Sequence, residues 1–262
     1  MTEIDGARGR ITVHTWGGDE PTSIVLRVHG YGEHARRYDH VAEALVASGA
    51  VVYAPDHLGH GESEGERVSI ETMEDLVDDV ERVAKLAEDT HPGLPLTMIG
   101  HSMGGMIATR FAQRRGDDLK ALVLSGPVIG GNPDLFGLIA LDPIPEVPID
   151  PAVLSRDPEV GRAYAADELV WHGAFKRETL QAFIDSVELI ASSGDLGELP
   201  TLWIHGEDDA LAPLAATRPA IERIRGSAFT EHIWPGARHE VFNESNRDEV
   251  IAEVVAFLSA EA

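Results

Sequence analysis

The 262-residue sequence is 43% hydrophobic and 25% charged, with 26 glycines and 15 prolines, which is typical of a folded chain and excludes a disordered or collagen-like protein. It contains no cysteine, which excludes a disulfide scaffold, a cysteine nucleophile and thiolate metal sites. The formal charge of −24 disfavours binding to nucleic acid and to anionic lipid. No apolar run approaches the roughly 18 to 20 residues of a transmembrane helix, and residues 1–10 lack the apolar core of a secretory signal, so we expect a cytoplasmic protein.

Acidic residues outnumber basic ones by 45 to 21, and only Lys85, Lys120 and Lys176 are lysines. A salt-rich cytoplasm favours such an acidic, lysine-poor surface, and a biased genome composition produces the same pattern. The sequence leaves both explanations open.

Strands and helices alternate through the first half of the chain. The strands are continuous apolar runs, as in the segment 24–28 (IVLRV), which ends in a glycine-rich loop. Such runs predict a mostly parallel sheet covered by helices on both faces. The elements expected here are strands at 24–28, 50–54, 96–99 and 121–125 and helices at 41–46, 72–90 and 103–115.

The alternation stops at residues 130–199, which contain six prolines and a helix-like stretch at 177–191 but no strand pattern. We interpret this segment as an inserted, mostly helical cap. The sheet pattern resumes with strands at 201–205 and 230–234, a helix at 215–225 and a final helix from Asn246. The prediction is an α/β core, residues 1–129 and 200–262, that carries a helical cap at 130–199.

The motif Gly-His-Ser-Met-Gly-Gly at 100–105 lies between a predicted strand and a predicted helix. A serine at such a turn is held in a strained backbone conformation and presented above the sheet, and flanking glycines let strand and helix pass closely. The N-terminus of the helix also offers N–H groups to a developing oxyanion. Ser102 is therefore the candidate nucleophile.

A serine nucleophile needs a histidine base, and the histidine needs a carboxylate. Asp208 and Asp209 follow the strand that ends at His205, and His239 follows the last strand. The order serine, acid, histidine is that of α/β hydrolases. His205 lies inside a strand, and His101 precedes the serine, where we expect it to support the turn.

Together these motifs resemble the α/β-hydrolase superfamily and, within it, the monoacylglycerol lipase family, and the likeness extends essentially from end to end. The loop His-Gly-x-Gly-Glu-His followed by Arg-Tyr stands at 29–38, the turn Asp-x-x-Gly-His-Gly-x-Ser at 56–63, and the serine motif at 100–105. The segment Ser-Arg-Asp-Pro-Glu-Val at 155–160 is similar to bacterial members. The resemblance implies an α/β-hydrolase fold with an inserted helical cap.

The resemblance also implies a catalytic triad. Ser102 would be the nucleophile, His239 the general base and acid, and Asp209 the orienting carboxylate. Asp209 is preferred to Asp208, the fallback, because family members carry the acid third after the glycine.

Further site residues follow from the same resemblance. The backbone N–H groups of Tyr31 and Met103 would form the oxyanion hole. Tyr31 stands where many members have a smaller residue, so its ring either narrows the pocket mouth or its hydroxyl binds the alcohol of the substrate. Glu33 and Arg37 fall on positions that line the polar alcohol pocket, although a plain ion pair four residues apart is the alternative.

We expect neither a metal nor a cofactor. His57 and His60 resemble a metal pair, but no third ligand at workable spacing accompanies them, and in this superfamily the turn is structural.

The apolar residues of the cap form an acyl-chain entrance, a surface in transient contact with lipid, or ordinary packing onto the core. These residues are Leu135, Phe136, Leu138, Ile139, Leu141, Ile144, Val147 and Ile149.

The function implied is hydrolysis of a lipid ester, monoacylglycerol, to glycerol and fatty acid through an acyl-enzyme. A general carboxylesterase or a lysophospholipase with the same triad is the near alternative. A non-catalytic hydrolase-fold receptor is the alternative from another class. The sequence does not indicate the oligomeric state.

Overall fold

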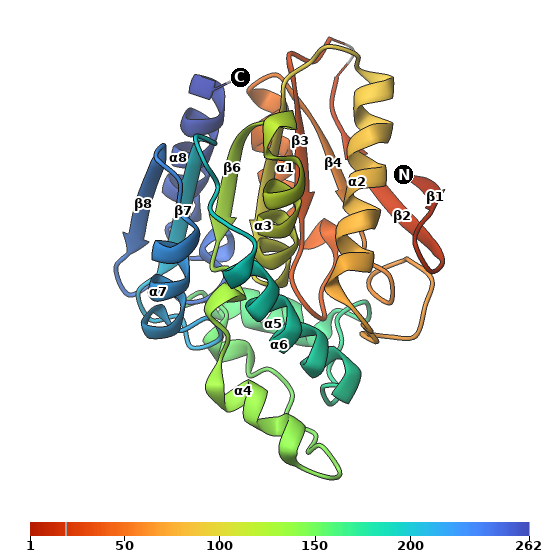
Figure 1. Ribbon diagram of the computed structural model, residues 1–262, viewed down its shortest axis with the longest axis vertical. Helices are drawn as coiled ribbons and strands as arrows, with labels where there is room; N and C mark the ends of the chain where they lie inside the picture. The colour runs from red at the N-terminus through yellow and green to blue at the C-terminus, as the bar shows by residue number, and fades with distance from the viewer. Residues whose placement is uncertain (19, 262) are drawn as a thin grey trace.

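The computed structural model describes residues 1–18 and 20–261, which form one eight-stranded sheet with helices on both faces (Figure 1). Its order is β1-β2-β4-β3-β5-β6-β7-β8, and only the pairings of β1 with β2 and of β2 with β4 are antiparallel in this described part. The predicted mostly parallel sheet is confirmed. The strands are β1 (Thr2–Asp5), β2 (Arg10–Trp16), β3 (Ser23–Val28), β4 (Ala50–Pro55), β5 (Leu96–His101), β6 (Leu119–Ser125), β7 (Thr201–Gly206) and β8 (Phe229–Trp234).

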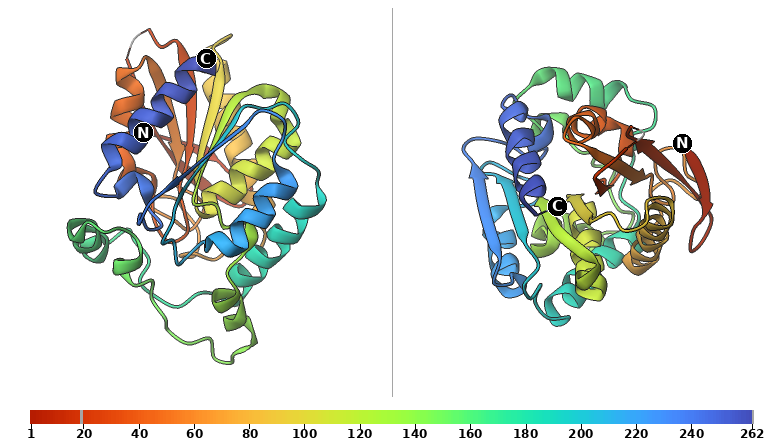
Figure 2. Two further views of the ribbon diagram at one scale, coloured as in Figure 1. Left: turned by 90° about the vertical axis from the view of Figure 1, so that its left-hand side faces the viewer. Right: turned by 90° about the horizontal axis from the view of Figure 1, so that it is seen from above.

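Helices cover the two faces of the sheet and bury separate apolar clusters (Figure 2). One cluster combines α1 (Asp39–Ala47) and α8 (Arg247–Glu261), and the other combines α2 (Met73–Thr90), α3 (Met103–Arg115) and α7 (Leu214–Ile224). Within residues 1–18 and 20–261, no helix has the length and apolar composition needed to cross a lipid bilayer.

Strands β1 and β2 are absent from the sequence prediction. The segment Arg-Ile-Thr-Val-His-Thr-Trp at Arg10–Trp16 is rich in β-branched and aromatic residues, which is a strand signal. Four consecutive residues of it are buried, so it has no clean alternation of apolar and polar positions. The hairpin lies outside the repeating strand–helix pattern on which the prediction was based.

The segment between β6 and β7, which the sequence analysis interprets as a cap, lies at one end of the sheet (Figure 1). It contains α4 (Pro133–Gly137), α5 (Pro158–Ala166) and α6 (Arg177–Ser192). Residues 141–150, between α4 and α5, are irregular. Helix α6 contributes Ala182, Phe183 and Ile190 to the larger core cluster. The later half of the inserted segment is therefore packed onto the core, whereas the earlier half projects from it.

Asp79 on α2 ties the N-terminal hairpin to the core. Its Oδ1 accepts the N–H of Ala7 at 2.5 Å, and Arg82 Nε lies 3.8 Å from the carboxylate. Burial outweighs both contacts and raises the pKa of Asp79 from 3.8 to about 6. Because the folded-state pKa is raised, ionisation lowers stability progressively between pH 3.8 and about 6, and the full penalty persists above that.

We expect Asp79→Asn to stabilise the protein at pH 8 by about 1 kcal/mol, a value reduced for solvent screening, which corresponds to a Tm gain of roughly 2 to 4 °C. The gain should disappear near pH 4, where the carboxyl is protonated in both states. Thermal unfolding at both pH values measures it, with Asp89→Asn, a change in an exposed pair with Lys85, as the control. An unchanged or lower Tm at pH 8 would contradict the pKa of Asp79.

Candidate active site

Ser102 occupies the sharp turn between β5 and α3, with φ 55° and ψ −117°. Few residues other than glycine adopt this region, so the surrounding structure must hold the serine there. The Ser102 N–H donates to Ser125 O at 3.0 Å, and its carbonyl accepts from Gly105 N–H at 2.9 Å. The predicted strand–serine–helix turn is thus present, with the serine side chain at the carboxyl end of the sheet.

Glycine is required beside Ser102 because backbones approach closely. A Cβ at Gly104 would lie 2.2 Å from Val28 O, and a Cβ at Gly100 would lie 2.3 Å from Gly104 O. Helix α3 can therefore press against β3 and β5 only without these side chains.

His239 and Asp209 form a buried pair, with Nδ1 of the histidine 2.8 Å from Oδ2 of the carboxylate. Oδ1 of Asp209 accepts the N–H groups of Leu211 at 2.9 Å and Ala212 at 2.8 Å. Asp208 is exposed on the same loop, so the structure places Asp209 and not the fallback beside the histidine.

The pair also sets the charge of both groups. Burial opposes ionisation of Asp209, but His239, His205 at 3.3 Å and the backbone N–H groups outweigh it and lower the Asp209 pKa to about 2. Burial likewise opposes protonation of His239, yet Asp209 outweighs it and raises the His239 pKa above 6.5. The imidazole is therefore a stronger base than in water, and a carboxylate is fixed behind it.

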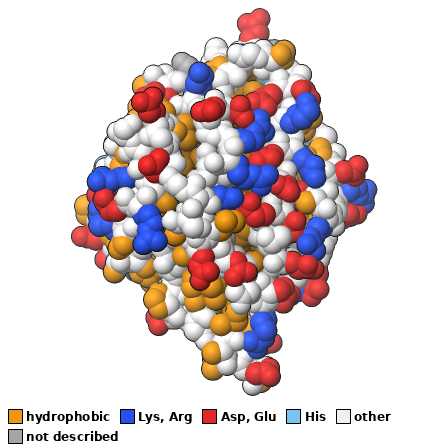
Figure 3. Space-filling view, in the orientation of Figure 1, with side chains coloured by type: hydrophobic (Ala, Val, Ile, Leu, Met, Phe, Trp, Pro, Cys, Tyr) orange, Lys and Arg blue, Asp and Glu red, His pale blue; other side chains and the backbone are white. Residues whose placement is uncertain are grey.

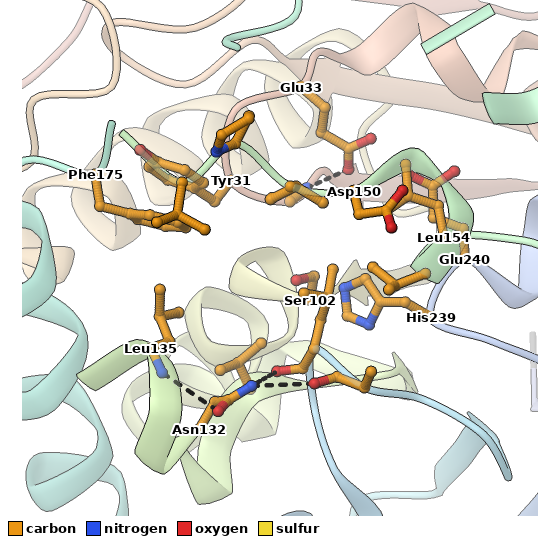
Figure 4. A pocket seen from close by; sticks show the side chains of 18 of the residues that line it. Tyr31, Glu33, Ser102, Asn132, Leu135, Asp150, Leu154, Phe175, His239 and Glu240 are labelled. Atoms are coloured by element: carbon orange, nitrogen blue, oxygen red, sulfur yellow. Dashed lines mark hydrogen bonds between the residues drawn. The ribbon is translucent and has the colours of Figure 1, made fainter. Parts of the chain in front are cut away.

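Ser102 and His239 lie side by side and face the same cavity (Figure 4). His101 packs behind them, its ring centroid 4.8 Å from that of His239 and its Nδ1 3.1 Å from Ser125 O. Burial, together with His239, lowers the His101 pKa to about 3, so His101 stays neutral. This position agrees with its expected support of the turn.

The two predicted oxyanion donors flank Ser102. Met103 is the first residue of α3, where backbone N–H groups have no partner within the helix. The loop carrying Tyr31 lies directly against the serine, since a Cβ at Gly30 would be 3.1 Å from Ser102 Cβ. The Tyr31 ring stacks on Phe175 of the cap, with centroids 4.6 Å apart.

Glu33 and Arg37 both line the cavity and also form the ion pair that was the alternative interpretation. Arg37 makes a second, two-pronged pair with Glu240 at 2.6 and 2.9 Å. Glu240 and Tyr164 are site residues that the sequence analysis missed. Glu240 directly follows His239, which was the one available signal, whereas nothing marks Tyr164 in the cap sequence.

The cavity above Ser102 has a volume of about 480 Å³, within the usual range for ligand pockets. Tyr31, Phe175 and Leu135 lie on one side of it, with Asn132 beside Leu135. Glu33, Asp150 and Glu240 lie on the other, with Leu154 among them (Figure 4). One side of the site is therefore mainly apolar and the other mainly charged, with the serine between them.

One cluster in residues 1–18 and 20–261 has metal-ligand spacing, namely His14, Asp56 and Glu62, whose ligand atoms lie within 4.8 Å of one another. Asp56 is already bonded to His14 at 3.0 Å and to the N–H groups of Ala35 and Glu62. Its carboxylate thus acts as a structural acceptor. His57 and His60 are buried, with ring centroids 6.1 Å apart and edge-on packing.

The fold and the buried serine, histidine and aspartate define the class of α/β hydrolases with a serine nucleophile motif. The model of the family described as serine aminopeptidase, S33, matches residues 19–246. The chain belongs to this family.

The relatives bear out the expected resemblance to monoacylglycerol lipases. The monoacylglycerol lipase of Mycolicibacterium smegmatis is 36% identical over 259 residues, covering 95% of this chain and 92% of that protein. The monoglyceride lipase of Homo sapiens is 30% identical, over 86% of this chain and 77% of its own. The crystal structure of Paleococcus ferrophilus monoacylglycerol lipase superposes with a TM-score of 0.82 at 27% identity, covering 96% and 99% of the two chains.

The close backbone approach at the serine turn gives a prediction. Gly104→Ala should lower the free energy of unfolding by roughly 1 to 3 kcal/mol and reduce activity, because helix α3 must move away from Val28. The matched control is Gly116→Ala, where a Cβ meets no described atom within 4 Å and stability should change by less than about 1 kcal/mol. Urea unfolding measures both, and equal stability of the two variants would refute the packing constraint.

Proposed function

We propose that this protein is a carboxylic ester hydrolase that cleaves monoacylglycerols to glycerol and fatty acid. The observation that carries the proposal is the position of Ser102, beside His239, between the apolar and polar sides of one cavity. An ester with one acyl chain and a polar alcohol places its carbonyl at that boundary. Relatives named monoacylglycerol lipase support the same substrate.

In this mechanism Ser102 Oγ attacks the ester carbonyl while His239 accepts its proton. The N–H groups of Tyr31 and Met103 stabilise the oxyanion. His239 then protonates the departing glycerol, and water, activated by His239, releases the fatty acid from the acyl-enzyme. Asp209 keeps the imidazole oriented and stabilises its positive charge.

The polar side suits an uncharged alcohol. Three acidic residues, Glu33, Asp150 and Glu240, line this side together with one basic residue, Arg37, so a phosphate-bearing alcohol would be repelled. Tyr164 lines the same side, and within the described residues its buried hydroxyl has no hydrogen-bond partner. This hydroxyl can pair with a substrate oxygen. The excess of acidic side chains, which repels a phosphate, is what favours glycerol over the headgroup of a lysophospholipid.

The projecting part of the cap gives the substrate access from lipid. Leu141 and Val147 are 47% and 51% exposed, and apolar side chains gather at the cap end of the molecule in Figure 3. Residues 131–155 contain four acidic residues and no lysine or arginine. The proposed contact is therefore a transient one with uncharged lipid surfaces rather than anionic ones.

The test compares hydrolysis of a monoacylglycerol, matched di- and triacylglycerols, a p-nitrophenyl ester and an amino-acid p-nitroanilide. We expect the monoacylglycerol to have the highest kcat/KM, and Ser102→Ala to lower its turnover by at least about 10³-fold. Ser227→Ala, at an exposed serine, is the matched control.

Equal kcat/KM for the p-nitrophenyl ester would leave a general carboxylesterase. Turnover of the anilide alone would point to a peptidase. No turnover, with no labelling of Ser102 by a fluorophosphonate, would point to a non-catalytic receptor.

A further inference from the structure

Three charged side chains lie buried beside the active site without a role in the steps above. The side chains of Glu33, Arg37 and Glu240 are 4%, 8% and 3% exposed. Buried ion pairs contribute little to stability on balance, because desolvation offsets their attraction, whereas loss of one partner is strongly destabilising. Because stability does not account for these three buried charges, we ask which parts of the active site their contacts hold in place.

Each carboxylate oxygen in the group already has a partner. Glu33 Oε1 accepts the Gly30 N–H at 2.6 Å and the Tyr38 hydroxyl at 3.1 Å, and Oε2 faces Arg37 Nη1 at 2.5 Å. Glu240 uses both oxygens on Arg37, and Oε2 also accepts Asn243 Nδ2 at 2.8 Å. The strongest charge-assisted contacts are thus directed at the protein itself and not at the cavity.

These contacts join two loops from opposite ends of the chain. Glu33 fixes Gly30, which precedes Tyr31 in the loop against Ser102. Glu240 follows His239, and its N–H donates to Leu154 O of the cap at 2.8 Å. Arg37 lies between the two carboxylates, so its guanidinium sets the distance between the Tyr31 loop and the His239 loop.

We propose that Arg37, Glu33 and Glu240 form a positioning clamp, in which the guanidinium fixes the oxyanion loop relative to His239, instead of binding the substrate alcohol. The proposal rests on Ser102-dependent ester hydrolysis. It does not depend on which ester is preferred, because the clamp acts at the acyl carbonyl.

The two roles separate on a pair of esters with the same acyl chain, a monoacylglycerol and a methyl ester. Arg37→Lys keeps the charge but loses the two-pronged geometry, and Glu240→Gln keeps the shape but loses the charge. For both variants we expect kcat on its pH plateau to fall by about 10- to 100-fold on both esters alike, with KM within about twofold, because a small misplacement of reacting groups lowers kcat. The plateau is used because the Glu240 charge also raises the pKa of His239. A fall in kcat/KM that is confined to the monoacylglycerol and arises mainly from a higher KM would overturn the clamp in favour of alcohol binding.

Controls separate positioning from unfolding. Arg218→Lys changes an arginine that pairs with Glu231 at the surface and should leave kcat unchanged. Each kcat is normalised to the fraction of Ser102 that a fluorophosphonate labels at saturation, and Tm is recorded. If Arg37→Lys does not fold, Glu240→Gln alone decides the outcome.

A second readout uses the Gly30 amide. Its short bond to the Glu33 carboxylate should place its proton resonance far downfield. We expect Glu240→Gln to shift this resonance although Gly30 does not touch Glu240, and an unmoved resonance would contradict the clamp.

If wild type fails to cleave the monoacylglycerol but cleaves the methyl ester, the substrate proposal fails while the clamp is still decided on the methyl ester. If wild type cleaves neither ester, the clamp is tested by the rate at which a fluorophosphonate labels Ser102. Equal labelling rates in wild type and Glu240→Gln would overturn the clamp.

Discussion

The close approach of helix α3 to strands β3 and β5 is the constraint on which the site depends. Ser102 keeps a left-handed backbone conformation only because Gly100 and Gly104 remove the side chains that would separate helix from sheet. That approach places the helix N-terminus next to the serine, and it brings the Gly30 loop against the same side chain. This packing contact therefore fixes the nucleophile and brings both expected oxyanion donors beside it, whereas the proposed clamp sets the position of the Tyr31 loop relative to His239.

The electrostatics of the site depend on burial in an acidic protein. The net charge is −24, so the overall field of the protein disfavours ionised carboxylates, and each one needs local partners to stay charged. Asp209 is ionised because His239 and two backbone N–H groups surround it, and the resulting charge makes His239 a better base. Beside His239, Arg37 forms ion pairs with Glu33 and Glu240, and its attraction outweighs burial and lowers the pKa of Glu240.

The features predicted correctly from the sequence are those that a short local pattern determines. The apolar strands, the turn at Ser102 and the positions of Asp209 and His239 after β7 and β8 all follow from short motifs, and the structure places these residues together. The N-terminal hairpin was missed because β2 is buried in a continuous stretch and lies outside the strand–helix alternation. Glu240 and Tyr164 were missed because their importance arises from contacts across more than 100 residues, as in the pair of Arg37 with Glu240, which no local pattern records. The roles of Tyr31, Met103, Glu33 and Arg37 stay predictions.

The central claim is that Ser102 carries the acyl group of the substrate during turnover. Rapid acid quenching of monoacylglycerol hydrolysis, followed by mass spectrometry of the peptides, measures this directly. An ester adduct of the mass of the acyl chain on the peptide that contains Ser102, appearing before free fatty acid reaches its steady rate, is the expected result. Steady release of fatty acid with no adduct at any time, or with the acyl group on another residue, would contradict it.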